Sequence, residues 1–125
     1  MRIEGISWAG DRTHSFERQR RFVEQILGLS VSHEASDLAV FKLPNGDTFE
    51  IFGPRAPNPP EQFSRNEIVI GFRVDDIDRA REELSSAGIE LLGPIQQDRP
   101  GGHAWQHFRA PDGKVYELCY DPPPT

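Results

Sequence analysis

The chain of 125 residues has only one cysteine, Cys119, so it can form no intramolecular disulfide and has no CxxC zinc motif. No apolar run reaches the 18 residues that a membrane-spanning helix needs, and the first ten residues lack the apolar core of a secretory signal. Basic residues are outnumbered by acidic ones, 14 to 20, which gives a net charge of -6. Such a surface repels phosphate backbones. We therefore expect a cytoplasmic protein that binds neither nucleic acid nor membranes.

An internal repeat organises the chain. The segment FKLPNGDTFEI at residues 41–51 returns as FRAPDGKVYEL at residues 108–118, with Phe, Pro, Gly and Glu identical. Proline followed by Asn or Asp and then Gly is typical of a type I turn that closes a hairpin through a left-handed glycine. Each segment is therefore predicted to be a β-hairpin.

The repeat extends upstream, since each half has a strand followed by a helix. Strands are predicted at residues 3–10 and 67–74, and Gly28 and Gly88 are expected to end the two helices in the left-handed conformation. Asp75 or Asp76 can cap the second helix. The sequence also predicts two buried faces, which are Phe16, Val23, Ile26 and Leu27 on the first helix and Ile77, Ala80, Leu84 and Ala87 on the second.

These elements predict an α+β fold of two βαβββ modules. The modules span about residues 1–53 and 66–121, joined by a proline-rich linker at residues 54–65 and followed by a proline tail at residues 122–125. Neither half is long enough to bury a secure core alone. We therefore expect the modules to lie side by side as one domain, with a cupped mixed sheet and the helices on its outer face.

The turn type fixes which side chains share a face of each hairpin. A type I turn with a glycine bulge pairs Phe41 with Phe49 and Phe108 with Tyr116, which places these rings under the helices. The opposite, polar face then holds the following residues: Lys42, Thr48, Glu50, Trp105, His107, Arg109, Val115, Glu117 and Cys119. A two-residue turn would instead place the phenylalanines beside the glutamates.

Glu50 and Glu117 occupy equivalent positions of the repeat. Two facing carboxylates can bind a divalent cation or transfer protons, although two solvated glutamates would give the same pattern. His107 is predicted to lie opposite Glu117, as an imidazole held by a carboxylate or as an ordinary cross-strand pair. The thiol of Cys119 has no activating partner in the sequence, so we expect it to be buried and inert.

The chain resembles the vicinal oxygen chelate superfamily, which contains glyoxalases, extradiol dioxygenases and bleomycin resistance proteins. The resemblance rests on four segments of the sequence: LGL at 27–29, FEIF at 49–52, IGFRVDDI at 70–77 and APDGKVYEL at 110–118. It implies a small-molecule protein that is a lyase or a dioxygenase-like enzyme, and a homodimer. One scaffold of this kind supports many reactions.

The resemblance also implies a metal held by a His or Gln on the first strand of each half and a Glu on the last. Glu50 and Glu117 match the carboxylate positions, whereas Trp8 and Val69 stand at the imidazole positions and cannot bind a metal. The metal site is therefore degenerate, and His107 is the remaining candidate for a third ligand. The alternative is a non-catalytic binding protein of the bleomycin-resistance type, in which Trp8 and Trp105 line an aromatic site and Arg73 and Arg109 bind an anionic group. The two tryptophans can equally be core residues, and the two arginines can be solvated.

Overall fold

The computed structural model describes residues 1–56, 63 and 66–123 and divides into two compact units. The N-terminal unit consists of residues 8–69, and the C-terminal unit consists of residues 1–7 together with residues 70–125. Positions 57–62, 64 and 65 of the predicted linker, and positions 124 and 125 of the tail, lie outside the described residues. None of the described helices is long and apolar enough to cross a membrane.

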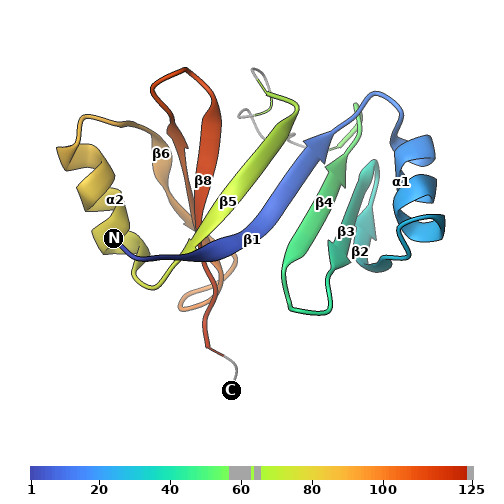
Figure 1. Cartoon of the computed structure of the whole chain (residues 1–125), viewed down its shortest axis with the longest axis horizontal. Helices are drawn as coiled ribbons and strands as arrows, with labels where there is room; N and C mark the ends of the chain where they lie inside the picture. Colours follow the sequence, from blue (N-terminus) through green and yellow to red (C-terminus); the bar gives the residue numbers. More distant parts are fainter. Residues whose placement is uncertain (57–62, 64–65, 124–125) are drawn as a thin grey trace. The chain divides into compact units, whose positions relative to one another are not determined.

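Each half of the chain has the predicted order of strand, helix and three strands (Figure 1). The elements of the first half are β1 (Ile3–Arg12), α1 (Phe16–Gln25), β2 (Ser30–Ala35), β3 (Leu38–Lys42) and β4 (Thr48–Phe52). Those of the second half are β5 (Ile68–Val74), α2 (Ile77–Ser86), β6 (Glu90–Gln97), β7 (Ala104–Arg109) and β8 (Val115–Tyr120). The prediction of a mixed α+β fold is confirmed, and β1 runs two residues further than expected.

The strand order is equivalent in the two halves. It is β2-β3-β4-β1 in the first and β6-β7-β8-β5 in the second. The first strand pairs with the last in parallel in both halves, whereas the remaining pairs are antiparallel. The strands of each half therefore form a mixed sheet, as the repeat predicted.

The hairpin register follows the glycine-bulge turn. The Ala110 N–H donates to the Lys114 carbonyl at 2.7 Å, and the Leu43 N–H donates to the Asp47 carbonyl at 2.8 Å. Gly46 and Gly113 have φ values of 92° and 95°, a conformation that residues with a Cβ rarely adopt. Phe41 pairs with Phe49 and His107 with Glu117, so the predicted register is confirmed.

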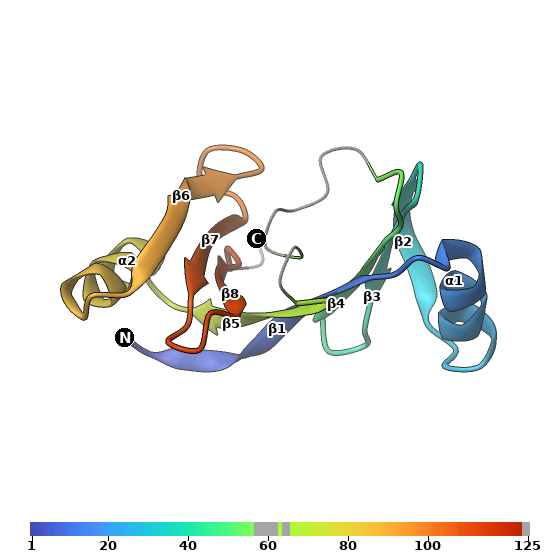
Figure 2. The same cartoon turned by 90° about the horizontal axis from the view of Figure 1, so that it is seen from above.

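Each helix packs on the aromatic face of its own sheet. In the N-terminal unit, Phe16 and Val23 of α1 pack with Phe41 and Ile51. In the C-terminal unit, α2 lies along β6 and contacts β7 and β8, where Ile77 and Ala80 pack with Phe108 and Leu118 (Figure 2). The predicted cores under the helices are therefore confirmed.

Three of the predicted helix core positions are wrong. Ile26 and Leu27 are 73% and 55% exposed, because α1 ends at Gln25 and the chain turns away there. Ala87 is exposed as the residue that ends α2. Both turns have the predicted left-handed glycine, with φ values of 74° at Gly28 and 79° at Gly88.

Candidate functional site

The candidate site in the C-terminal unit lies on the face of β7 and β8 that points away from α2. Ala104 and Phe108 pack against the helix, and side chains alternate along a strand. Trp105, His107 and Arg109 therefore share the opposite face of β7. Glu117 and Cys119 of β8 lie in register with His107 and Trp105.

A histidine–carboxylate pair lies in the middle of this face. Nε2 of His107 is 2.9 Å from Oε2 of Glu117, and the two side chains are only 14% and 9% exposed. An ionised carboxylate only accepts hydrogen bonds, so with Glu117 ionised the proton of the neutral imidazole lies on Nε2 and the lone pair on Nδ1. This is the arrangement of a general base oriented by a carboxylate.

Cys119 completes a buried polar cluster around Glu117. Its thiol donates to Oε1 of Glu117 at 3.2 Å, so both carboxylate oxygens have a hydrogen-bond partner. Burial raises the pKa of the Cys119 thiol, and the charge of Glu117 raises this pKa further. The prediction of a buried thiol is confirmed, and a thiol with such a pKa is a poor nucleophile.

Ser7 is a member of this cluster that sequence reasoning missed. The residue is 5% exposed, and its hydroxyl makes no hydrogen bond of normal geometry within the described residues. The hydroxyl is nevertheless near enough to Cys119 to lower the pKa of the thiol slightly. A serine in a strand carries no signal in the sequence that would indicate such a position.

Other side chains on this face are already engaged. The Trp105 indole N–H donates to Oε1 of Gln96 at 3.2 Å, beside the His107–Glu117 pair. Arg109 Nε donates to Oε2 of Glu90 at 2.8 Å, and its Nη1 donates to the Gly113 carbonyl at 3.1 Å. An anionic ligand would therefore have to compete with Glu90 for Arg109.

Arg73, the other predicted anion-binding residue, is paired in the same unit. Its Nε lies 3.8 Å from Oε1 of Glu4, and its Nη2 lies 3.5 Å from the Glu4 carbonyl. The Arg73 side chain is 36% exposed. The assignment of Arg73 and Arg109 to ligand binding stays a prediction.

Glu50 and Trp8 are joined by a hydrogen bond within the N-terminal unit. The Trp8 indole N–H donates to Oε1 of Glu50 at 2.9 Å. The ring lies across Gly10, where an added Cβ would be 2.4 Å from a Trp8 ring carbon and 2.8 Å from Phe63. Trp8 thus packs against the apolar cluster of Phe52, Ala56, Phe63 and Val69.

The donor set does not fit the expected metal. The Trp8 indole N–H occupies one oxygen of Glu50, and His107 and Cys119 occupy both oxygens of Glu117. Val69 is fully buried in an apolar cluster, and neither valine nor tryptophan offers a lone pair to a metal. Among the described residues, no three His, Cys, Asp or Glu side chains are grouped so that they could hold a metal ion. The predicted pairing of Glu50 with Glu117 stays a prediction.

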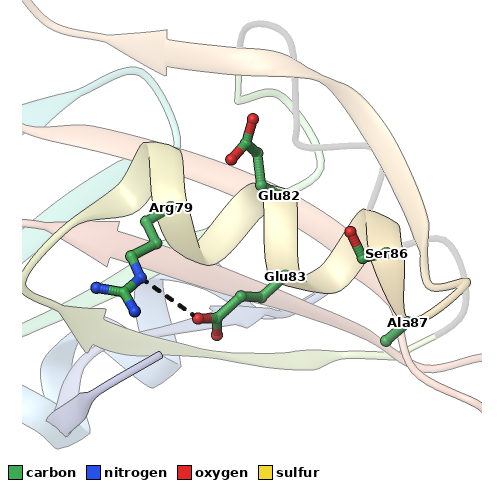
Figure 3. A pocket seen from close by; sticks show the side chains of 5 residues that line it. All are labelled: Arg79, Glu82, Glu83, Ser86 and Ala87. Carbon is green, nitrogen blue, oxygen red and sulfur yellow. Dashed lines mark ion pairs between the residues drawn. The ribbon is translucent and has the colours of Figure 1, made fainter.

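A surface depression along α2 is separate from these residues. It is lined by Arg79, Glu82, Glu83, Ser86 and Ala87 (Figure 3). Arg79 Nε lies 3.6 Å from Glu83, which also pairs with the amino group of Met1. Because all five lining residues belong to one helix or its end, the depression is an exposed helix surface.

Comparison with known proteins identifies the fold. Residues 5–118 match the model of the glyoxalase/bleomycin resistance protein/dioxygenase superfamily. No curated protein shows significant sequence similarity to the chain. The similar solved structures named below are less than 25% identical to the chain, so they show the fold and not the activity.

Three of these structures carry different names on the same fold. A superfamily member from Vibrio splendidus 12B01 is 16% identical with a TM-score of 0.68, and the match covers 96% of this chain and 100% of that one. Methylmalonyl-CoA epimerase from Mycobacterium tuberculosis is 16% identical with a TM-score of 0.73, covering 97% and 90%. The Mn(II)-bound glyoxalase from Novosphingobium aromaticivorans is 22% identical with a TM-score of 0.75, covering 96% of this chain but only 40% of that one. With its two βαβββ halves and its matching sequence, the chain belongs to the glyoxalase/bleomycin resistance protein/dioxygenase superfamily.

Proposed function

We propose that the protein is a small-molecule enzyme of the lyase or isomerase type that transfers a proton with the His107–Glu117 pair and without the usual metal of its superfamily. The observation that carries this proposal is the largely buried His107–Glu117 pair, with 2.9 Å between Nε2 and Oε2. Glu117 orients the imidazole and stabilises the imidazolium that forms when His107 takes a proton. Trp105 supplies an apolar surface beside it for the substrate.

Two further points support proton transfer over the dioxygenase alternative. Chemistry with O₂ depends on a metal or an organic cofactor, whereas Glu50 and Glu117 already accept hydrogen bonds from side chains of the protein itself. The solved neighbours include methylmalonyl-CoA epimerase, and an epimerisation removes and returns a proton at a carbon atom. Proton transfer is therefore the reaction that this set of residues supports best.

Deuterium exchange tests the proposal directly. The protein would be incubated in D₂O with a panel of 2-oxo acids, hydroxyketones and acyl thioesters, and loss of the carbon-bound proton followed by ¹H NMR. A general base contributes about 10²–10⁴-fold, so H107Q and E117Q should lose exchange by that factor. If H107Q exchanges as fast as the wild type, the proposal is wrong.

His33 provides a control. It lies on β2 of the N-terminal unit, where its side chain is exposed. H33Q should therefore leave exchange unchanged.

A metal titration tests the degenerate donor set. The side chains around Glu50 and Glu117 predict no binding of Mn²⁺, Fe²⁺, Ni²⁺ or Zn²⁺ at micromolar levels. Isothermal titration calorimetry would measure it, and E50Q and E117Q are the control variants. Tight binding that both variants abolish would contradict this prediction.

The alternative function is sequestration of an aromatic or amphipathic ligand without chemistry. It is favoured by the two half-buried tryptophans, Trp8 and Trp105, which stand in the two units. A ligand that quenches the fluorescence of W8F, where Trp105 is the only indole, and causes no deuterium exchange would support sequestration. Unchanged Trp105 fluorescence with every ligand tested would contradict binding at this face.

A further inference from the structure

Glu117 accepts hydrogen bonds from two side chains, one on each oxygen. His107 lies on Oε2, and the thiol of Cys119 donates to Oε1 at 3.2 Å. Cys119 is two residues along β8, so its side chain emerges on the same face as that of Glu117. A carboxylate held at both oxygens cannot rotate without losing one of these bonds.

Burial favours the hydrogen bond from the Cys119 thiol to Glu117 over a hydrogen bond from water. Glu117 and Cys119 are 7% and 6% exposed, so little water is available to replace the thiol as a donor. The Ser7 hydroxyl is buried nearby without a hydrogen-bond partner in the described part of the chain, and it acts on the thiol as a donor, since it lowers the pKa of Cys119. The thiol proton is thus left to Glu117, and a charged acceptor forms a strong hydrogen bond.

We propose that Cys119 is a positioning residue for the His107–Glu117 pair. The thiol proton holds Oε1 of Glu117, which keeps Oε2 on Nε2 of His107. The imidazole is thereby held in the tautomer with its proton on Nε2 and its lone pair on Nδ1. This inference rests on the proposed function, in which the His107–Glu117 pair transfers the substrate proton.

The conservative substitution C119S and the apolar substitutions C119A and C119V separate positioning from packing. A serine hydroxyl still donates to Glu117, whereas alanine and valine do not. The ¹⁵N chemical shifts of the His107 ring, assigned with H107Q, report the tautomer in the free, full-length protein. We expect the Nε2–H tautomer in the wild type and in C119S, and loss of this preference in C119A and C119V.

His33 serves as the internal control, because it lies on β2 of the N-terminal unit and is exposed. Its ring shifts should be the same in every variant, and dispersed amide spectra would confirm that C119A or C119V is folded. If a folded C119A or C119V keeps the His107 tautomer of the wild type, the inference is overturned. The two proposals fail differently: a changed tautomer in C119A together with full exchange activity in H107Q would retain the positioning role and reject the proposed reaction.

Discussion

At the scale of single residues, packing and hydrogen bonding decide what the conspicuous side chains do. Trp8 lies over Gly10 and donates to Glu50, so its ring depends on the missing Cβ of a neighbour two positions away. Cys119 is inert as a nucleophile yet donates to Glu117. Neither role follows from the type of residue alone.

Replacing Gly10 by alanine should displace the Trp8 ring. The new Cβ would lie 2.4 Å and 2.7 Å from two Trp8 carbons, which is closer than any real contact. Overpacking of this kind costs about 1–3 kcal/mol in the free energy of unfolding, measured by urea denaturation. In a Trp8→Ala background the same change should cost less, since only the contact with Phe63 at 2.8 Å remains, and an equal cost in both backgrounds would contradict the clash with Trp8.

Cys119 should make stability fall at alkaline pH. Its pKa is raised in the folded state above the ordinary 9.0, so folding keeps the thiol protonated. This contribution is complete below pH 9.0 and is lost as the pH rises towards the folded pKa. The free energy of unfolding of the wild type should therefore decrease relative to C119A above pH 9.0, by up to about 1.4 kcal/mol per pH unit. Parallel curves for the two proteins would rule this out.

At the scale of elements, the two helices end alike but begin differently. The Asp76 side chain accepts a hydrogen bond from the Arg79 N–H at 3.1 Å and caps α2, as predicted. Ser15 stands at the same position of α1 and makes no side-chain capping bond. The two halves thus have equivalent turns and helix C-termini, but their helix N-termini are capped differently.

The two caps form a matched pair for mutation. Asp76→Ala should lower the free energy of unfolding by about 0.5–2 kcal/mol, because it removes the only side-chain acceptor seen at that helix start among the described residues. Ser15→Ala should change it by much less. Urea midpoints with unchanged m-values would measure both, and equal losses would mean that the capping bond is not the cause.

At the scale of the whole molecule, two strands belong to both units. Residues Ile3–Ser7 of β1 and residues 70–74 of β5 are part of the C-terminal unit, whereas the rest of each strand is part of the N-terminal unit. If one unit unfolded, the other unit would retain only its own part of β1 and of β5. The units should therefore unfold together.

Each unit has its own tryptophan, which makes this testable. W105F leaves only Trp8 in the N-terminal unit, and W8F leaves only Trp105 in the C-terminal unit. Within each variant, the denaturation curves from tryptophan fluorescence and from far-UV circular dichroism should coincide. Separate transitions in either variant would show that the units unfold independently.

The predicted homodimer concerns the whole molecule too and stays a prediction. Ile3 and Ile6 are large apolar side chains of β1, and they are 48% and 51% exposed. These residues are the first to substitute in a test of association.

Much of the architecture could be predicted from the sequence, because the two halves share the same turn motif. Pro-Asn-Gly-Asp and Pro-Asp-Gly-Lys set the turns, the turns set the strand register, and the register placed His107 opposite Glu117. The burial of Ile26, Leu27 and Ala87 was predicted wrongly, since the apolar pattern continues past the residue where each helix ends. A periodic pattern of apolar residues does not show at which residue a helix ends.

The sequence by itself determined the two βαβββ halves, the superfamily and the absence of imidazole at positions 8 and 69. Only the tertiary structure decided that the Trp8 indole donates to Glu50 and that Ser7 is buried beside Cys119. The physical reason is the range of the interactions. Turns and strand alternation act between residues close in the chain, whereas a buried hydrogen bond joins whatever donor and acceptor the packed fold brings together.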